Sequence, residues 1–304
     1  MEYVLETSGL TKRYRACTVL NDLSMHVPKG AIYGLVGRNG AGKTTLIRLI
    51  CGLQEPSGGS YSLYGVRNSS ARISRSRRRM GAVVETPSIY LDMTASENLC
   101  HQYRVLGVPS EAGIDRLLQL VGLEGVGRKK VRNFSLGMRQ RLGIAVALAG
   151  KPDFLVLDEP VNGLDPQGII EIRELILKLN REQGITFLIS SHILDELARL
   201  ATHYGFIDAG SMVTEMSGEE LEQRCRKCVR VEVSSIRTLV QVLDEMGLEY
   251  SIAEENEADI YGSFEVTALS TQAAQRGCII YSMKERDESL ESFYMNLIGG
   301  ARHA

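Results

Sequence analysis

The 304-residue sequence lacks a basic excess, a long apolar run and a leader-like start. Its formal net charge is −2, whereas a duplex-binding protein usually carries a clear positive excess, so composition does not favour nucleic acid. No stretch approaches the roughly 18 consecutive apolar residues that a membrane-spanning helix needs. The first residues, MEYVLETSGLTKRY, contain no apolar core of a signal peptide. We therefore expect a chain that folds in the cytosol.

Cysteines are few and scattered, and internal repeats and low-complexity linkers are missing. Of the six cysteines, only Cys225 and Cys228 form a C-x-x-C pair. A zinc site would need a second pair or nearby histidines, so we interpret both as ordinary thiols of a cytosolic chain. Hydrophobic residues make up 44% and charged residues 24%, as in ordinary globular proteins. The length allows one large domain with an appendix, or two domains.

A glycine-rich segment follows an apolar run near the N-terminus. Residues 31–36 predict a buried strand and residues 44–52 predict a helix. Between them, residues 37–44 match the phosphate-loop pattern G-x-x-x-x-G-K-[ST] in full. The glycines let backbone N–H groups point at phosphate oxygens, and the helix start adds partial positive charge. We predict a nucleotide site from these residues: Gly37, Arg38, Asn39, Gly40, Ala41, Gly42, Lys43, Thr44 and Thr45.

A second buried strand ends in two carboxylates. The segment DFLVLDEP, residues 153–160, predicts a parallel strand whose acids lie at the edge where α/β sheets bind ligands. Asp158 is predicted to hold Mg²⁺, directly or through water, and the Thr44 hydroxyl is predicted to be a further ligand. Lys43 would reach the β- and γ-phosphates, and Glu159 would orient or deprotonate the attacking water.

A second candidate anion site lies in NFSLGMRQR, residues 133–141. Ser135 and Gly137 open a predicted helix, whose first N–H groups and free hydroxyl suit an anion. The phosphate loop already provides one cradle, so these residues alone do not identify the second anion.

Together these segments resemble the ATP-binding cassette family, the ABC ATPases. The family's five motifs occur in order: the phosphate loop, the signature at 135–140, the acidic strand at 155–159, VNGLDP at 161–166 and SSHILDE at 190–196. The resemblance covers roughly residues 3–218 and is nearest to the exporters of the bacitracin and lantibiotic type.

The resemblance implies a head-to-tail dimer of cassettes that sandwiches two ATP molecules. Ser135 and the Gly137 N–H would bind the γ-phosphate of ATP held by the partner cassette, and the loop at 163–165 would link the two sites. Tyr14 stands where the family stacks an aromatic ring on adenine, although a tyrosine in a strand is common for other reasons.

The same resemblance implies a catalytic set of Glu159, His192 and Lys43. His192 would contact the γ-phosphate of its own cassette. The alternative, a satisfied surface histidine, is disfavoured by its position after the apolar strand predicted at 185–189 and before Leu-Asp-Glu.

The chain departs from the family pattern at two positions. Leu136 replaces a glycine of the signature, but the hydroxyl and the N–H that the trans contact needs remain at Ser135 and Gly137. Glu85 replaces a glutamine that usually touches Mg²⁺ and the attacking water. A carboxylate still ligates Mg²⁺ but adds negative charge near the γ-phosphate. The replacement is expected either to slow hydrolysis or to alter its coupling, and the sequence leaves both alternatives open.

The expected fold is an α/β P-loop cassette in residues 1–218, with an α/β core, an antiparallel β subdomain and a helical subdomain at about 86–149. Thr94 and Glu97 form a capping pattern in the helical part. Residues 219–304 predict a small α+β domain. Its expected strands are 229–233, 249–255, 259–266 and 278–285, and its expected helices are 236–246, 271–276 and 288–299.

The leading hypothesis is the ATP-hydrolysing motor subunit of a transporter that exports peptide antibiotics or related drugs. It would use ATP and Mg²⁺, form a homodimer, and act on a separate polytopic permease at the inner face of the cell membrane, without direct contact to nucleic acid. A basic cluster at 74–79 would touch anionic lipid, or simply be a solvated face. Alternatives are a soluble ABC ATPase acting on nucleic acid or ribosomes and a nucleotide-gated regulator. The absence of a heptad repeat between Lys43 and Ser135 disfavours the soluble ATPase, and the intact Glu159 disfavours the regulator.

Overall fold

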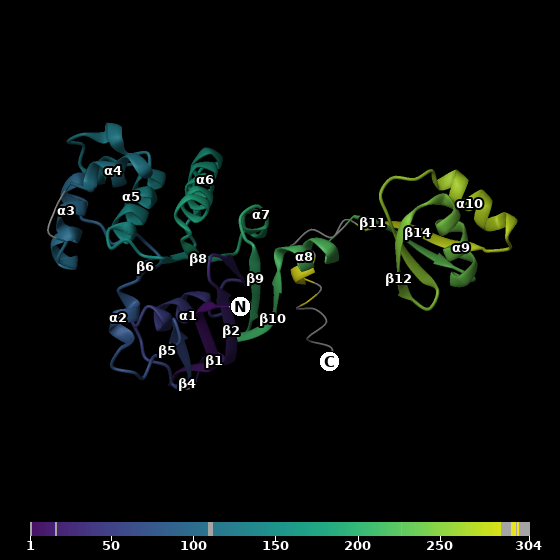
Figure 1. Ribbon diagram of the computed structural model, residues 1–304, viewed down its shortest axis with the longest axis horizontal. Helices are drawn as coiled ribbons and strands as arrows, with labels where there is room; N and C mark the ends of the chain where they lie inside the picture. The colour runs from purple at the N-terminus through teal and green to yellow at the C-terminus, as the bar shows by residue number, and fades with distance from the viewer. Residues whose placement is uncertain are drawn as a thin grey trace. The chain divides into compact units, whose positions relative to one another are not determined.

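The chain folds into two compact units, Met1–Gly218 and Glu219–Ala304 (Figure 1). The computed structural model describes residues 2–15, 17–108, 112–225, 227–286, 293–295 and 297. The first unit contains the predicted cassette and the second the predicted appendix, and each unit has its own hydrophobic core.

The centre of the first unit is a six-stranded sheet of order β10-β9-β3-β8-β7-β6. All neighbouring pairs are parallel except β9 and β10. The central strands are buried along their whole length, which explains their continuous apolar sequence. The strands are β3 (Ile32–Val36), β6 (Met80–Val83), β7 (Phe154–Asp158), β8 (Thr186–Ser191), β9 (His203–Asp208) and β10 (Ser211–Ser217).

The register of this sheet brings three distant sequence segments to one edge. Val36 at the end of β3 pairs with Ser191 of β8, and Asp158 at the end of β7 pairs with Ser190. Because parallel strands all end at the same side, the loops after β3, β7 and β8 start next to one another.

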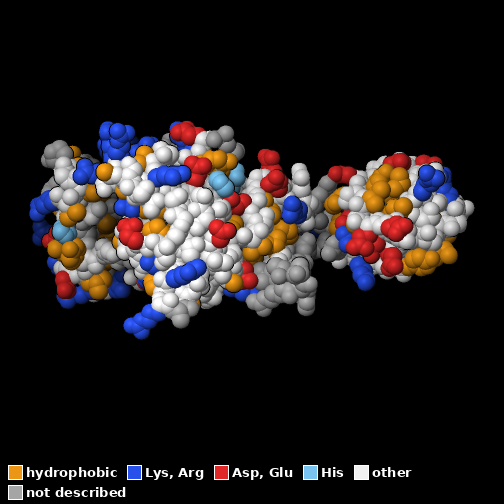
Figure 2. Space-filling view, turned by 90° about the horizontal axis from the view of Figure 1, so that it is seen from below, with side chains coloured by type: hydrophobic (Ala, Val, Ile, Leu, Met, Phe, Trp, Pro, Cys, Tyr) orange, Lys and Arg blue, Asp and Glu red, His pale blue; other side chains and the backbone are white. Residues whose placement is uncertain are grey.

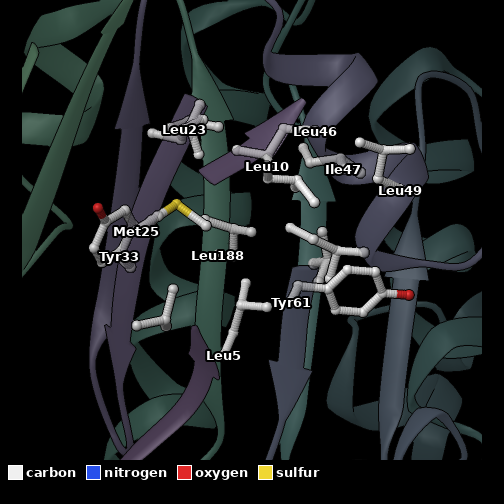
Figure 3. Close-up of a cluster of buried hydrophobic side chains, with 14 of the residues drawn as sticks. Leu5, Leu10, Leu23, Met25, Tyr33, Leu46, Ile47, Leu49, Tyr61 and Leu188 are labelled. Atoms are coloured by element: carbon white, nitrogen blue, oxygen red, sulfur yellow. The ribbon is translucent and has the colours of Figure 1, made fainter. Parts of the chain in front are cut away.

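A four-stranded antiparallel sheet of order β2-β1-β4-β5 covers helix α1 (Lys43–Ile50). Apolar residues of this sheet, of α1 and of the central sheet form one buried cluster (Figure 3). Leu46, Ile47 and Leu49 of α1 pack there between the two sheets. The core thus holds the helix that follows the phosphate loop from both sides. The strands are β1 (Tyr3–Tyr14), β2 (Cys17–Pro28), β4 (Gly58–Leu63) and β5 (Val66–Arg67).

Helices α3, α4 and α5 gather at one end of the first unit as the predicted helical subdomain (Figure 1). Their bounds are α3 (Ala95–Leu106), α4 (Ile114–Leu120) and α5 (Leu136–Leu148), with short 3₁₀ turns at η1 (Glu124–Val126) and η2 (Val131–Asn133). The other helices are α2 (Ile73–Arg77), α6 (Pro166–Gln183), α7 (Leu194–Ala198) and α8 (Gly218–Arg224).

The predicted capping box at the start of α3 is confirmed. The Thr94 hydroxyl accepts a hydrogen bond from the Glu97 N–H at 3.2 Å, and the Glu97 carboxylate accepts one from the Thr94 N–H at 2.7 Å. These bonds lower the pKa of Glu97 below its usual range. Two N–H groups without an intrahelical partner are satisfied together, so the sequence pattern sets where α3 begins.

Replacing Thr94 by alanine is expected to lower the free energy of unfolding by about 1 kcal/mol, because one capping acceptor is lost. Urea unfolding followed by circular dichroism measures the change. The matched variant Glu97→Gln keeps an acceptor for the Thr94 N–H and should lose less. No loss in Thr94→Ala would show that the cap does not stabilise the unit, and an equal loss in Glu97→Gln would contradict the smaller effect expected of that variant.

The second unit is a βαββαβ fold with an antiparallel sheet of order β12-β13-β11-β14, which confirms the predicted α+β class. Two boundaries were predicted wrongly: the third strand ends at Tyr261 instead of 266, and the following helix begins at Val266 instead of 271. The elements are β11 (Cys228–Val233), α9 (Ile236–Met246), β12 (Glu249–Glu254), β13 (Glu257–Tyr261), α10 (Val266–Gln275) and β14 (Ile280–Arg286). Most of the predicted closing helix at 288–299 lies outside the described residues. Within this segment the structure describes residues 293–295 and 297, and these are helical.

The surface of the second unit carries exposed apolar side chains, and Figure 2 shows orange patches beside acidic groups on one of its faces. The large exposed apolar residues among the described part of this unit are Ile252, Val266, Ile279, Tyr281 and Met295. Within the described part of the whole chain, no helix is both long and apolar enough to cross a membrane.

Candidate nucleotide-binding site

The loop between β3 and α1 adopts the curled backbone that its glycines predict. Gly42 is left-handed with φ 107°, and a Cβ there would lie 2.7 Å from Leu20 Cδ2 and 3.0 Å from the Val19 carbonyl oxygen. No other residue type fits this position without strain. The first turn of α1 contains no acidic residue, so the partial positive charge of the helix start is not offset locally.

Lys43, the first residue of α1, is buried with 6% of its surface exposed. Its ammonium donates to the Gly37 carbonyl oxygen at 2.6 Å, and a longer contact of 3.4 Å joins it to the Arg38 carbonyl oxygen. The side chain therefore folds back over the loop and keeps its positive charge at the centre of the curl.

This loop opens into a cavity of about 370 Å³. The loops after β3, β7 and β8, the first turn of α1 and one residue of β2 contribute its walls: Val19, Arg38, Asn39, Gly40, Gly42, Lys43, Thr44, Thr45, Glu159, Asn162 and His192. Most of the predicted nucleotide residues are thus brought together with all three predicted catalytic residues, Lys43, Glu159 and His192, on a common wall. Of the phosphate loop, Gly37 and Ala41 lie behind the lining residues, and Ala41 is buried.

Asp158 ends β7 and is buried, with 1% of its surface exposed. Its Oδ1 accepts a hydrogen bond of 2.5 Å from the Ser190 hydroxyl. Among the described residues, its Oδ2 has no hydrogen-bond partner. A buried carboxylate oxygen without a partner is costly unless a cation or a donor reaches it.

Glu159 joins Lys43 and His192 into one network. Its Oε1 lies 3.3 Å from the Lys43 ammonium, and its Oε2 lies 2.7 Å from His192 Nδ1. The Glu159 backbone has φ 50°, which non-glycine residues rarely adopt and which typically marks a functional position. The three predicted catalytic side chains are therefore in direct contact.

Cys51 at the end of α1 lies close enough to Asp158 to respond to its charge. Burial raises the pKa of the Cys51 thiol to about 12, and the Asp158 carboxylate adds to this rise. The thiol is therefore protonated at physiological pH.

Glu85 and Tyr14 are two further predicted residues that do not line the cavity. Glu85 follows β6 with φ 61°, and its carboxylate oxygen lies 2.5 Å from Arg48 Nη2 in the last turn of α1. Tyr14 ends β1, is 39% exposed, and its hydroxyl donates to the side chain of Gln54. Their roles at Mg²⁺ and adenine remain predictions.

The signature residues lie at the start of α5 and outside the cavity lining. Ser135 is the exposed N-cap, and its hydroxyl accepts a hydrogen bond from the Met138 N–H at 3.3 Å. Leu136 is 45% exposed, and its Cδ2 would lie 3.3 Å from a Cβ at Gly163. The leucine that replaces the usual glycine thus packs beside the loop that follows β7, in its own chain.

Similarity to known proteins identifies the family. The model of ABC transporter domains matches residues 20–162. The bacitracin transport ATP-binding protein BcrA of Enterococcus faecalis is 40% identical, with 99% of this chain and 98% of the relative covered. The chain belongs to the ABC transporter family. The lantibiotic transport ATP-binding protein SrtF of Streptococcus pyogenes is 43% identical over 72% of this chain and 95% of its own. A solved structure of the ATP-binding subunit of an ABC transporter is 32% identical with a TM-score of 0.64, covering 73% of this chain and 92% of that one.

ABC cassettes bind and hydrolyse ATP, and the cavity is suited to that activity. The curled loop, the start of α1 and Lys43 provide positive character for phosphates. Asp158 Oδ2, which has no hydrogen-bond partner in the part of the chain that the structure describes, fits a divalent cation. Among the described residues no three His, Cys, Asp or Glu side chains cluster as a metal site, but Mg²⁺ bound with a nucleotide needs only one or two carboxylates.

Three residues of this ABC site were not predicted. Asn162 and Val19 line the cavity, and Ser190 contacts Asp158. Asn162 stands in VNGLDP and Ser190 in SSHILDE, so a closer look at the polar members of both motifs could have found them. Val19 is an ordinary apolar residue of a strand, so its sequence does not indicate a site. Its position on the cavity wall becomes evident only from the structure, in which β2 lies against the phosphate loop.

Proposed function

We propose that this chain is the motor subunit of an ABC exporter of peptide antibiotics or related drugs. It works as a head-to-tail dimer at the inner face of the cell membrane, on a separate polytopic permease. The observation that carries the proposal is the contact network of Lys43, Glu159 and His192 on one wall of the phosphate-loop cavity. The bacitracin and lantibiotic transport proteins among its relatives support the class of cargo.

Each residue of the network has a role in hydrolysis. Lys43 binds the β- and γ-phosphates, and Asp158 and the Thr44 hydroxyl would hold Mg²⁺, which would neutralise phosphate charge. Glu159 orients the attacking water and takes its proton. His192 contacts the γ-phosphate and, through Nδ1, fixes the Glu159 carboxylate. Tyr14 stacks on adenine, and Glu85, now paired with Arg48, would contribute a further carboxylate to the Mg²⁺ site.

The position of the signature supports the proposed dimer. Ser135 is exposed and lies outside its own cavity, so its hydroxyl and the N–H of Gly137 are available to ATP held by a second copy. The start of α5 carries the partial positive charge that suits a γ-phosphate. Symmetric dimers of two identical chains are also the commonest form of oligomer.

Purifying this chain from its native membranes in mild detergent tests the partner. We expect a polytopic membrane protein to co-purify at matched abundance. In the proposed transporter this chain contributes the ATP-binding cassette, and a separate protein forms the transport path. Ribosomal proteins or DNA without any membrane protein would overturn the proposal and favour a soluble ATPase.

The surface variant Leu91→Glu sharpens this experiment. Leu91 is 46% exposed in the segment before α3, where the family resemblance implies that the permease docks. We expect the charge to reduce co-purification, whereas the matched variant Leu53→Glu, at a 64% exposed leucine after α1, should not. Equal recovery of the membrane protein with both variants would contradict this docking segment.

A further inference from the structure

Ser190 connects the two acids of the site. It is fully buried in β8, and its hydroxyl donates to Asp158 Oδ1 at 2.5 Å. The same hydroxyl accepts a hydrogen bond from the Glu159 N–H at 3.0 Å, and the Ser190 carbonyl oxygen accepts from that N–H at 3.2 Å. One side chain therefore contacts both neighbouring carboxylate residues.

We propose that Ser190 is a positioning residue for Mg²⁺-dependent nucleotide binding, an inference that rests on the proposed ATPase function. It acts through Asp158 and Glu159 and does not itself touch the nucleotide. Its hydroxyl holds Asp158 in one rotamer and supports the backbone of Glu159.

The effect on Asp158 follows from the two carboxylate oxygens. Without a partner, a carboxylate rotates about its terminal torsion, which has no sharp staggered minima. The bond from Ser190 engages Oδ1, and Oδ2 is left without a partner among the described residues. A divalent cation would therefore bind a carboxylate that is already oriented. Hydrogen bonds from a neutral hydroxyl are strongest when, as here, they are short and the acceptor is an ionised carboxylate.

The effect on Glu159 follows from its backbone. A non-glycine residue at φ 50° is strained and persists only where its surroundings hold it. The two acceptors on Ser190 satisfy the Glu159 N–H in this conformation. The Glu159 side chain is thereby directed at Lys43 and His192.

The neighbouring serine does not share this function. The Ser191 hydroxyl accepts from the Ile193 N–H at 2.9 Å and contacts the Ile193 carbonyl oxygen at 3.3 Å. Successive strand residues point to opposite faces, so Ser190 and Ser191 serve different sides of the sheet. At the beginning of β8, Thr186 is equally buried, and its hydroxyl accepts from the Gly30 N–H. It offers a control in the same strand.

Equilibrium binding of a fluorescent ATP analogue, measured in Mg²⁺ and in EDTA, tests the proposal on the full chain. We expect Ser190→Ala to lose about tenfold or more of the affinity that Mg²⁺ adds, with affinity in EDTA almost unchanged. Ser190→Thr keeps the hydroxyl and should restore the Mg²⁺ effect. The control Thr186→Val removes a buried hydroxyl of β8 and should retain it fully.

Three results would overturn the inference. The first is an unchanged Mg²⁺ effect in Ser190→Ala, the second is an equal loss in Thr186→Val, and the third is a Ser190→Thr variant that folds but does not recover. If Ser190→Ala does not fold, Ser190→Cys keeps the volume with a weaker donor and gives the same comparison. A wild-type chain whose nucleotide affinity does not respond to Mg²⁺ would instead contradict the proposed function itself.

Discussion

Replacing Glu159 by glutamine is expected to slow steady-state ATP hydrolysis by about 10³-fold while ATP binding is retained. Glutamine has nearly the same size and still presents an oxygen to Lys43, so the cavity should keep its shape. It cannot accept the proton of the attacking water, and its contact with His192 Nδ1 loses the charge of the carboxylate. Binding without turnover should therefore accumulate the ATP-bound state.

Two measurements check this expectation: phosphate release, and the size of the Glu159→Gln chain on a sizing column with and without ATP. The proposed head-to-tail sandwich predicts an ATP-dependent dimer. Glu182→Gln, at an exposed position near the end of α6, makes the same chemical change away from the cavity and should behave as wild type. Hydrolysis within tenfold of wild type would remove Glu159 from the catalytic role, and a chain that stays monomeric with ATP would contradict the sandwich.

The centre of the site was predictable from the sequence because its chemistry is local. The phosphate loop belongs to a short glycine-rich segment, and Asp158 and Glu159 end a short apolar run. Each of these patterns is typical of few structures other than a ligand site at the edge of a sheet. The parallel sheet then brings the ends of β3, β7 and β8 together through its register, without further information from side chains. Contacts that depend on this register, such as Ser190 with Asp158, could not be predicted from either segment alone.

Glu85 shows a second limit of sequence reasoning. The family resemblance implies a ligand for Mg²⁺ at this position, whereas the structure pairs the Glu85 carboxylate with Arg48. The two residues belong to different elements, and an ion pair between partly exposed side chains is worth little, so nothing in either segment favours it. The pairing is nevertheless compatible with a Glu85 side chain that moves when nucleotide binds.

The second unit shows why some boundaries were found and others missed. Helix α9 was predicted with its observed bounds, because Ser235 caps its start and Gly247, with φ 65°, ends it. Helix α10 begins after Glu265, which makes no side-chain cap. Without a start signal, Val266 was assigned to the preceding strand, and residues 267–270 were assigned to no element. Capping chemistry, rather than helix propensity, decided which boundary the sequence revealed.

Replacing Lys43 by alanine is expected to weaken ATP binding by about 100-fold and to abolish measurable hydrolysis. The loss has two parts. The phosphates lose a buried ammonium that lies between the Gly37 carbonyl oxygen and Glu159. In addition, Glu159 loses its positive partner, so its negative charge acts on the triphosphate without compensation.

The variant Lys43→Arg separates charge from geometry. The guanidinium keeps the charge but is larger and planar, whereas the ammonium occupies a site with only 6% exposure and reaches a carbonyl oxygen at 2.6 Å. We therefore expect Lys43→Arg to recover only part of the binding. Calorimetric titration with ATP measures both variants against Lys29→Ala, which removes an exposed lysine paired with Glu2 and should bind as wild type. An affinity of Lys43→Ala within threefold of wild type would mean that the backbone of the phosphate loop, and not this ammonium, supplies the binding energy.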